Sequence, residues 1–330
     1  MFDANHIVNN IFNAQIPFEQ RALDVFYYQY QHNSVYQQWC RQLGINDPFT
    51  IQNVAAIPYL PIVFFKTHQL ITNGATPELV FESSGTTGSI NSKHYVADAA
   101  LYTKSYLQGF EAAYGNVRNY CILGLLPSYL ERKGSSLVTM VDDLIRTSNH
   151  PQSGFYLYDH QALAAALKTL VAAATPTLLI GVTFALLDFA AAYPMPLGEH
   201  VIVMETGGMK GRRKELTLEQ VHDTLKNAFQ LSCIHSEYGM TELLSQAYAQ
   251  GNGRLVCSNT MQVCVRAEDD PLQCYAAGRG VLNIIDLANV YSCSFIATDD
   301  IAEVYTDGSF RIFGRLDTSD VRGCSLMVAH

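Results

Sequence analysis

The sequence of 330 residues has no apolar run long enough to cross a membrane. Its most apolar segment, residues 178–193, is interrupted by Asp188, whereas a spanning helix needs about 20 apolar residues. Residues 1–20 lack the basic start and the apolar run of a signal peptide. The sequence therefore predicts a cytoplasmic protein with no membrane insertion.

Basic residues are also scarce. The chain has 21 Lys and Arg against 30 Asp and Glu, which gives a formal net charge of −9. A nucleic-acid partner is not expected, because neutralising phosphates requires a basic face that no segment supplies. No low-complexity tract occurs, and 48% of the residues are hydrophobic, so a folded protein with a large core is expected.

The cysteines form no metal-binding pattern. None of the eight belongs to a C-x-x-C pair, and none has a histidine at zinc-finger spacing. They are interpreted as reduced thiols, most of them packed as small apolar side chains. Only Cys324, near the end of the chain, has neighbours that suggest chemistry.

Short β-rich runs alternate with helical patterns from residue 79 to residue 236. This alternation is typical of parallel strands joined by crossover helices. It predicts an α/β body over residues 1–254. The expected strands are 79–82, 120–126, 177–182, 200–205 and 232–236, and the expected helices are 98–114, 161–174, 184–193 and 218–229.

From residue 255 onward the pattern changes to short strands separated by turns. Asp307 and Gly308 form the strongest hairpin signal, since Asp-Gly accepts the positive φ angles of tight turns. The sequence predicts a small antiparallel β subdomain over residues 255–330. Its expected strands are 262–266, 280–286, 294–298, 301–306 and 309–313.

A loop rich in hydroxyls and glycine follows the first expected strand. Glycines allow backbone amides to turn toward an anion, and hydroxyls add donors. The loop lacks the Gly-Lys-Ser/Thr of a Walker motif, and taken alone it also fits a plain surface turn. The candidate phosphate-binding residues are Ser83, Ser84, Gly85, Thr86, Thr87 and Gly88.

A second candidate segment, Tyr238-Gly239-Met240-Thr241-Glu242, follows the expected strand 232–236. An aromatic face can stack on adenine, and a threonine hydroxyl can bind a phosphate. The Glu242 carboxylate can hold Mg²⁺. A strand end with a solvated glutamate is the alternative interpretation of this segment alone.

A third segment contains Thr298-Asp299-Asp300 and, after the Asp-Gly turn, Gly314-Arg315. In this order, the three segments resemble the motifs of the acyl-adenylate-forming superfamily of acyl-CoA ligases, luciferases and adenylation domains. The resemblance implies ATP and Mg²⁺ as cofactors, with Asp300 and Arg315 at the ribose. Asp299 stands where the superfamily has glycine, so either aspartate could bind the ribose, and position favours Asp300.

The turn at Gly207 and Gly208, with its Met-Lys-Gly-Arg continuation, and residues 126–132 narrow the resemblance to LuxE-type acyl-protein synthetases, relatives of phenylacetate-type CoA ligases. This implies a large N-terminal-type adenylation domain in which both glycines lie beside the adenine. It also implies that the mobile C-terminal domain and its lysine are absent. Lys93, Lys210, Arg212 or loop amides would then supply the missing charge.

In LuxE-type synthetases a cysteine close to the C-terminus accepts the acyl group, and Cys324 matches that position. The neighbouring Arg322 would favour the thiolate, and Gly323 gives the backbone freedom to present it. Alternatively, Cys324 packs inertly beside Leu326 and Val328.

The predicted function is ATP-dependent activation of a carboxylic acid, expected to be a fatty acid, followed by acyl transfer to a protein thiol. Thr241, Glu242 and Cys324 are the candidate catalytic residues. The expected partners are the acid and an acyl-accepting protein such as a reductase subunit. Two alternatives are a compact acyl-CoA ligase and a non-catalytic nucleotide- or acyl-binding scaffold. The sequence specifies neither the acid, the final acceptor nor the oligomeric state.

Overall fold

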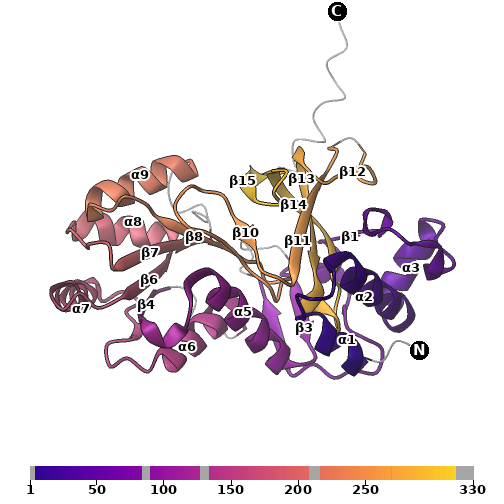
Figure 1. The fold of residues 1–330 in the computed structure, drawn as a ribbon, viewed down its shortest axis with the longest axis horizontal. Coiled ribbons are helices and arrows are strands. Elements are labelled where there is room, and N and C mark those ends of the chain that lie inside the picture. Colours follow the sequence, from indigo (N-terminus) through magenta and orange to yellow (C-terminus); the bar gives the residue numbers. More distant parts are fainter. Residues whose placement is uncertain (1–3, 84–89, 127–133, 208–215, 269, 317–330) are drawn as a thin grey trace, which may run out of the picture.

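The computed structural model describes residues 4–83, 90–126, 134–207, 216–268 and 270–316. Within these ranges the chain forms two large sheets and a separate two-stranded hairpin (Figure 1). No helix in the described ranges combines the length and the apolar character needed to cross a membrane.

The first sheet has seven strands in the order β10-β9-β8-β7-β6-β4-β5. Strands β5, β4, β6, β7 and β8 are parallel, and β9 and β10 are added antiparallel. All six residues of β6 are buried, as expected for a strand covered on both faces. The strands are Cys121–Leu125 (β4), Gly154–Phe155 (β5), Thr177–Val182 (β6), Val201–Thr206 (β7), His235–Tyr238 (β8), Ala247–Ala249 (β9) and Val256–Cys257 (β10).

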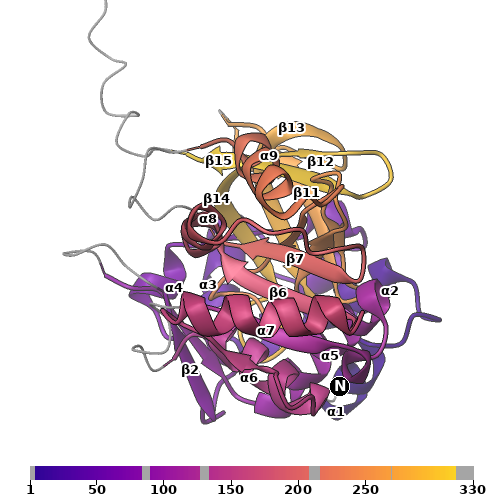
Figure 2. The same cartoon turned by 90° about the vertical axis from the view of Figure 1, so that its left-hand side faces the viewer.

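Helices cover both faces of this sheet, with α5 and α6 on one side and α8 and α9 on the other (Figures 1 and 2). Their ends follow local sequence signals: the Asp98 side chain caps α5, and Thr217 with Gln220 forms a capping box at α9. The helices are Ala99–Tyr114 (α5), Ser136–Ser148 (α6), His160–Ala172 (α7), Thr183–Ala192 (α8) and Leu218–Phe229 (α9).

The second sheet follows the order β1-β14-β13-β11-β12, with β15 paired to β14. Gly308, with φ of +80°, forms the turn between β14 and β15, which confirms the predicted Asp-Gly hairpin. The strands are Leu60–Pro61 (β1), Met261–Arg266 (β11), Cys274–Tyr275 (β12), Gly278–Asp286 (β13), Phe295–Val304 (β14) and Phe310–Arg315 (β15).

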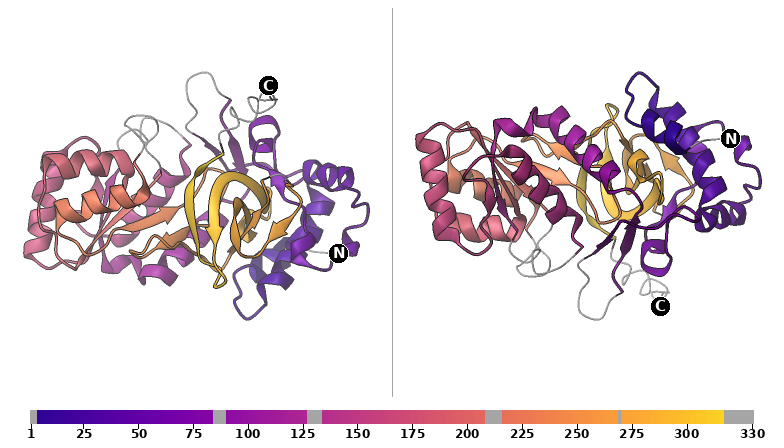
Figure 3. Two further views of the ribbon diagram at one scale, coloured as in Figure 1. Left: turned by 90° about the horizontal axis from the view of Figure 1, so that it is seen from above. Right: turned by 90° about the horizontal axis from the view of Figure 1, so that it is seen from below.

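N-terminal helices pack against this second sheet (Figures 1 and 3). The Phe26 ring contacts Phe295 edge-on, and Tyr36 stacks on the same ring. The N-terminal residues therefore share a core with the last third of the chain. The helices are Ala4–Asn10 (α1), Phe18–His32 (α2), Ser34–Gln42 (α3) and Phe64–Thr67 (α4).

The predicted α/β fold with an antiparallel β part is confirmed. Two strand assignments were wrong. Strand β8 is His235–Tyr238 rather than 232–236, because Thr206 and Tyr248 pair with Glu237 on either side. Strand β14 is continuous where two strands were expected, because Ile301 and Ala302 keep pairing with both neighbours. The boundary between residues 254 and 255 stays a prediction.

Candidate functional site

A buried carboxylate on β14 is the centre of the candidate site. Asp300 is 4% exposed. Its Oδ2 accepts a hydrogen bond from the Tyr238 hydroxyl at 2.7 Å, and its Oδ1 accepts one from Arg315 Nε at 2.8 Å. These contacts connect the ends of β8 and β15 to the middle of β14. Asp299 is exposed, so the structure distinguishes the two aspartates by burial.

Arg315 brings positive charge to this carboxylate while its side chain remains largely exposed. The nearby Asp300 carboxylate raises the pKa of the Arg315 guanidinium, and burial raises the pKa of the Tyr238 hydroxyl well above its usual value. A carboxylate has about four lone-pair positions, of which Tyr238 and Arg315 use two. Asp300 therefore retains capacity for two sugar hydroxyls, which is the chemistry expected at a ribose.

Glu242 is the second buried carboxylate, with 6% exposure. Burial raises its pKa, while a hydrogen bond from the Ser92 side chain and the charge of Arg315 oppose that rise. The charged form of a buried carboxylate is stabilised when a cation approaches it. Glu242 is thus suited to a Mg²⁺ ion that is shared with substrate phosphates, as Mg²⁺ usually is.

The loop that carries Thr241 and Glu242 is fixed by the buried Asp286. Its Oδ2 accepts the backbone amides of Leu244 and Ser245 at 2.7 and 3.0 Å, and its Oδ1 accepts the Ser245 hydroxyl. Sequence reasoning missed Asp286, although an aspartate at the end of an apolar strand was a visible signal. A single side chain about 40 positions later in the sequence therefore fixes this loop.

The hairpin of β2 (Leu79–Glu82) and β3 (Lys93–Val96) carries the predicted phosphate-binding loop. Ser83 begins this loop, and its hydroxyl accepts the Ser92 amide at 2.9 Å. Lys93 forms an ion pair with Glu82 at 3.2 Å, on an exposed surface. Of the predicted phosphate-binding residues, Ser83 is described, whereas Ser84, Gly85, Thr86, Thr87 and Gly88 lie outside the described residues.

The other predicted positions divide in the same way. Gly207 has φ of +69°, and its carbonyl accepts the Thr183 hydroxyl, so a turn follows β7 as expected. Neighbouring segments carry most of the other predicted residues, namely Tyr238, Gly239, Thr241, Glu242, Asp300 and Arg315. Outside the described residues lie Gly208, Lys210, Arg212 and Cys324.

A second polar cluster, which sequence reasoning missed, lies at the ends of β7 and β8. Glu237 accepts a hydrogen bond from the Thr206 hydroxyl, and Glu205 accepts one from Thr183 at 3.0 Å. Burial raises the pKa of Glu237 to about 7, and the neighbouring Glu205 adds to this effect. A Cβ on Gly239 would collide with the Glu237 carboxylate, so the glycine allows this carboxylate to fold back beneath the site.

Residues 5–128 match the family model described as acyl-protein synthetase, LuxE. The LuxE resemblance is confirmed for this region. The matched region contains the N-terminal helices, the β2–β3 hairpin and strand β4. None of the curated proteins matches the sequence.

Several solved structures share this fold. A 2-hydroxyisobutyryl-CoA ligase in complex with 2-HIB-AMP and CoA aligns with a TM-score of 0.61 and 12% identity, over 91% of this chain and 70% of its own. An o-succinylbenzoate coenzyme A synthetase from Bacillus subtilis, in complex with AMP, aligns with a TM-score of 0.50 and 12% identity, over 75% of this chain and 64% of its own.

A long-chain-fatty-acid-CoA ligase from Archaeoglobus fulgidus aligns with a TM-score of 0.51 and 14% identity, over 72% of this chain and 51% of its own. At these identities the alignments show the fold alone. The LuxE match over residues 5–128 is a separate finding, and it covers the part of the chain that precedes most of the parallel sheet.

Proposed function

We propose that this protein activates a carboxylic acid with ATP and Mg²⁺ to an acyl-adenylate and then passes the acyl group to a protein thiol. The observation that carries the proposal is the convergence of Tyr238, Asp300 and Arg315 beside the buried Glu242, where two sheets meet. The LuxE match over residues 5–128 supports the same reaction. A cytoplasmic location stays a prediction.

In this proposal Asp300 accepts the ribose hydroxyls and Arg315 holds Asp300 in place. The Thr241 hydroxyl donates to the α-phosphate, and the loop that begins at Ser83 binds the other phosphates. Glu242 would hold Mg²⁺, which would supply positive charge near the phosphates. The acid carboxylate attacks the α-phosphorus, and pyrophosphate leaves. The turn at Gly207 lies beside the adenine and the acyl group.

The second step is proposed at Cys324. Its thiolate attacks the carbonyl carbon of the acyl-adenylate, AMP leaves, and a thioester forms. A partner protein, such as a reductase subunit, would then take the acyl group. The expected acid is a fatty acid, in keeping with the LuxE match.

Intact-protein mass spectrometry tests both steps. Wild type and Cys324→Ala are incubated with MgATP and a panel of fatty and aromatic acids. We expect a hydroxylamine-labile acyl adduct on wild type alone, and its mass identifies the acid. No adduct, with pyrophosphate still released, would reassign the acceptor to CoA or another thiol. No pyrophosphate with any acid would contradict adenylation and favour a nucleotide-binding scaffold.

A further inference from the structure

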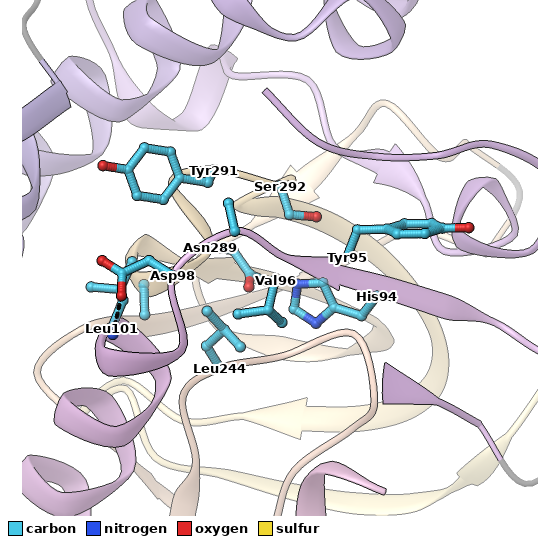
Figure 4. A pocket seen from close by; sticks show the side chains of 11 residues that line it. His94, Tyr95, Val96, Asp98, Leu101, Leu244, Asn289, Tyr291 and Ser292 are labelled. Carbon is cyan, nitrogen blue, oxygen red and sulfur yellow. Dashed lines mark hydrogen bonds between the residues drawn. The ribbon is translucent and has the colours of Figure 1, made fainter. Parts of the chain in front are cut away.

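Two buried polar side chains lie beside the candidate site but have no role in the function proposed above. His94 is 0% exposed on β3, and Asn289 is 1% exposed at the end of the 3₁₀ helix Leu287–Asn289. Both line one small pocket, together with Val96, Leu101 and Leu244 (Figure 4). The structure thus brings together residues from distant parts of the sequence.

Each side chain holds one carbonyl of the loop that carries the candidate catalytic residues. His94 Nδ1 lies 2.9 Å from the Thr241 carbonyl, and Asn289 Nδ2 donates to the Glu242 carbonyl at 2.8 Å. Since a carbonyl can only accept, His94 Nδ1 carries the proton. Two consecutive carbonyls are therefore fixed from two different elements, while Asp286 fixes the amides that follow.

The remaining polar atom of each side chain is the second observation. His94 Nε2 and Asn289 Oδ1 are buried and have no hydrogen-bond partner among the described residues. Both side chains point into the pocket (Figure 4). Buried unpaired acceptors are unfavourable, and an apolar residue at either position would avoid them. One water molecule, which donates two hydrogen bonds, has the chemistry to satisfy both.

The surroundings keep the imidazole neutral and oriented. The Phe65 ring meets it edge-on at 5.7 Å, and the Phe81 ring lies at 6.5 Å. Burial lowers the pKa of His94 to about 4, so a single neutral tautomer is present near pH 7. A neutral ring locked in this way offers one donor in a fixed direction.

We propose that His94 and Asn289 are positioning residues for adenylation, which fix the Thr241 and Glu242 carbonyls and share a bridging water. They thereby hold the Thr241 hydroxyl and the Glu242 carboxylate in register with the hairpin that carries the phosphate-binding loop. His94 lies on that hairpin, so its hydrogen bond connects the hairpin directly to the loop of Thr241 and Glu242. This proposal rests on the proposed adenylation activity.

A matched pair of variants tests the contact made by Nδ1. His94→Asn places an amide nitrogen near the position of Nδ1, whereas His94→Gln places it near Nε2. The assay is acid-dependent ATP–pyrophosphate exchange, with kcat and the KM for MgATP measured separately. We expect His94→Asn to stay within about threefold of the wild-type kcat and His94→Gln to fall about 30- to 100-fold, because small displacements of reacting groups are costly. Equal impairment of both variants, or full activity of His94→Gln, would overturn the proposal.

Asn289→Leu tests the hydrogen bond to the Glu242 carbonyl. This variant too should lower kcat by at least about tenfold. The double variant His94→Gln/Asn289→Leu should be no more than about threefold worse than the poorer single variant, because both act on one loop through one water. Losses that multiply would overturn the shared water. His200→Gln is the control, since His200 Nε2 is also buried and unpartnered among the described residues but precedes β7; its kcat should be unchanged.

Failure of the proposed function is recognised separately. If wild type shows no exchange with any acid, adenylation is rejected, and the positioning role is read from Mg²⁺-dependent ATP binding by calorimetry. His94→Asn should then bind like wild type and His94→Gln at least about fivefold more weakly. Equal affinities would overturn the positioning role.

Discussion

Asp300 is the side chain on which the proposed ribose contact depends, because it is buried and hydrogen-bonded to both Tyr238 and Arg315. We expect Asp300→Ala to raise the KM for ATP about 10- to 100-fold, since each charge-assisted hydrogen bond lost is worth about 1.5–3 kcal/mol. Asp299→Ala is the matched control, as Asp299 is exposed. Steady-state kinetics of the two variants decide the matter: a raised KM for Asp299→Ala alone would move the ribose contact by one residue.

The raised pKa of Glu237 predicts that the stability of the fold depends on pH. The unfolded chain releases this proton near pH 4.5 and the folded chain near pH 7, so between these values the folded state binds more protons. The free energy of unfolding therefore falls as pH rises through this window, by about 3 kcal/mol in total.

Glu237→Gln should remove this dependence and be more stable than wild type at pH 8. Urea unfolding at pH 5 and pH 8 measures the effect. The exposed Glu111 provides the control, since Glu111→Gln should follow the wild-type profile. A wild-type stability that does not fall between pH 5 and pH 8 would contradict a buried, protonated Glu237.

Strand β13 lies so close to β11 that it requires glycine at one position. A Cβ on Gly280 would collide with the carbonyl of Arg266 on β11, whose guanidinium binds the Thr298 carbonyl near Asp300. Gly280→Ala should cost about 1–3 kcal/mol of stability, as overpacking does. Gly154→Ala on β5 has no atom within 4 Å of its new Cβ and should be nearly neutral. Denaturant unfolding of both variants checks this, and equal stability would contradict the close approach.

Local patterns predicted many strands of both large sheets and four of the helices, but no element before residue 79 and not where every strand ends. The alternation of β-rich and helical patterns located α9 and β6 to the residue, since such patterns are local. Glu237 and Asp300 resembled loop residues, yet they lie in β8 and β14 because Thr206 and Arg315 on neighbouring strands pair with them. Such pairing depends on distant segments, which periodicity does not report.

The residues of the candidate site likewise include some that the sequence predicted and some that it did not. Asp300, Arg315 and Glu242 belong to motifs that a reader of the sequence can find. His94, Asp286 and Asn289 carry no motif, because their function comes from hydrogen bonds to a backbone loop about 40 to 150 residues away. Positioning residues of this kind become visible only when the chain is folded.

At the scale of the whole molecule, the described residues form two large apolar clusters that meet at strand β9. Ala247 and Ala249 belong to the cluster with Phe26, whereas Tyr248 between them belongs to the cluster with Phe189. Because one strand serves both, we expect the two parts to unfold together. Phe26→Ala and Phe189→Ala should each shift one common transition and cost about 3–5 kcal/mol. Two separate transitions, each moved by only one variant, would contradict a shared core.

Acid-dependent ATP–pyrophosphate exchange is the decisive assay for the proposed function, because it reports adenylation without requiring the final acceptor. Wild type is assayed with MgATP, labelled pyrophosphate and a panel of acids, beside Glu242→Gln. We expect exchange with at least one acid, loss of exchange without Mg²⁺, and a strongly raised Mg²⁺ requirement in Glu242→Gln. ATP binding without exchange for any acid, or exchange that Glu242→Gln leaves unchanged, would contradict it.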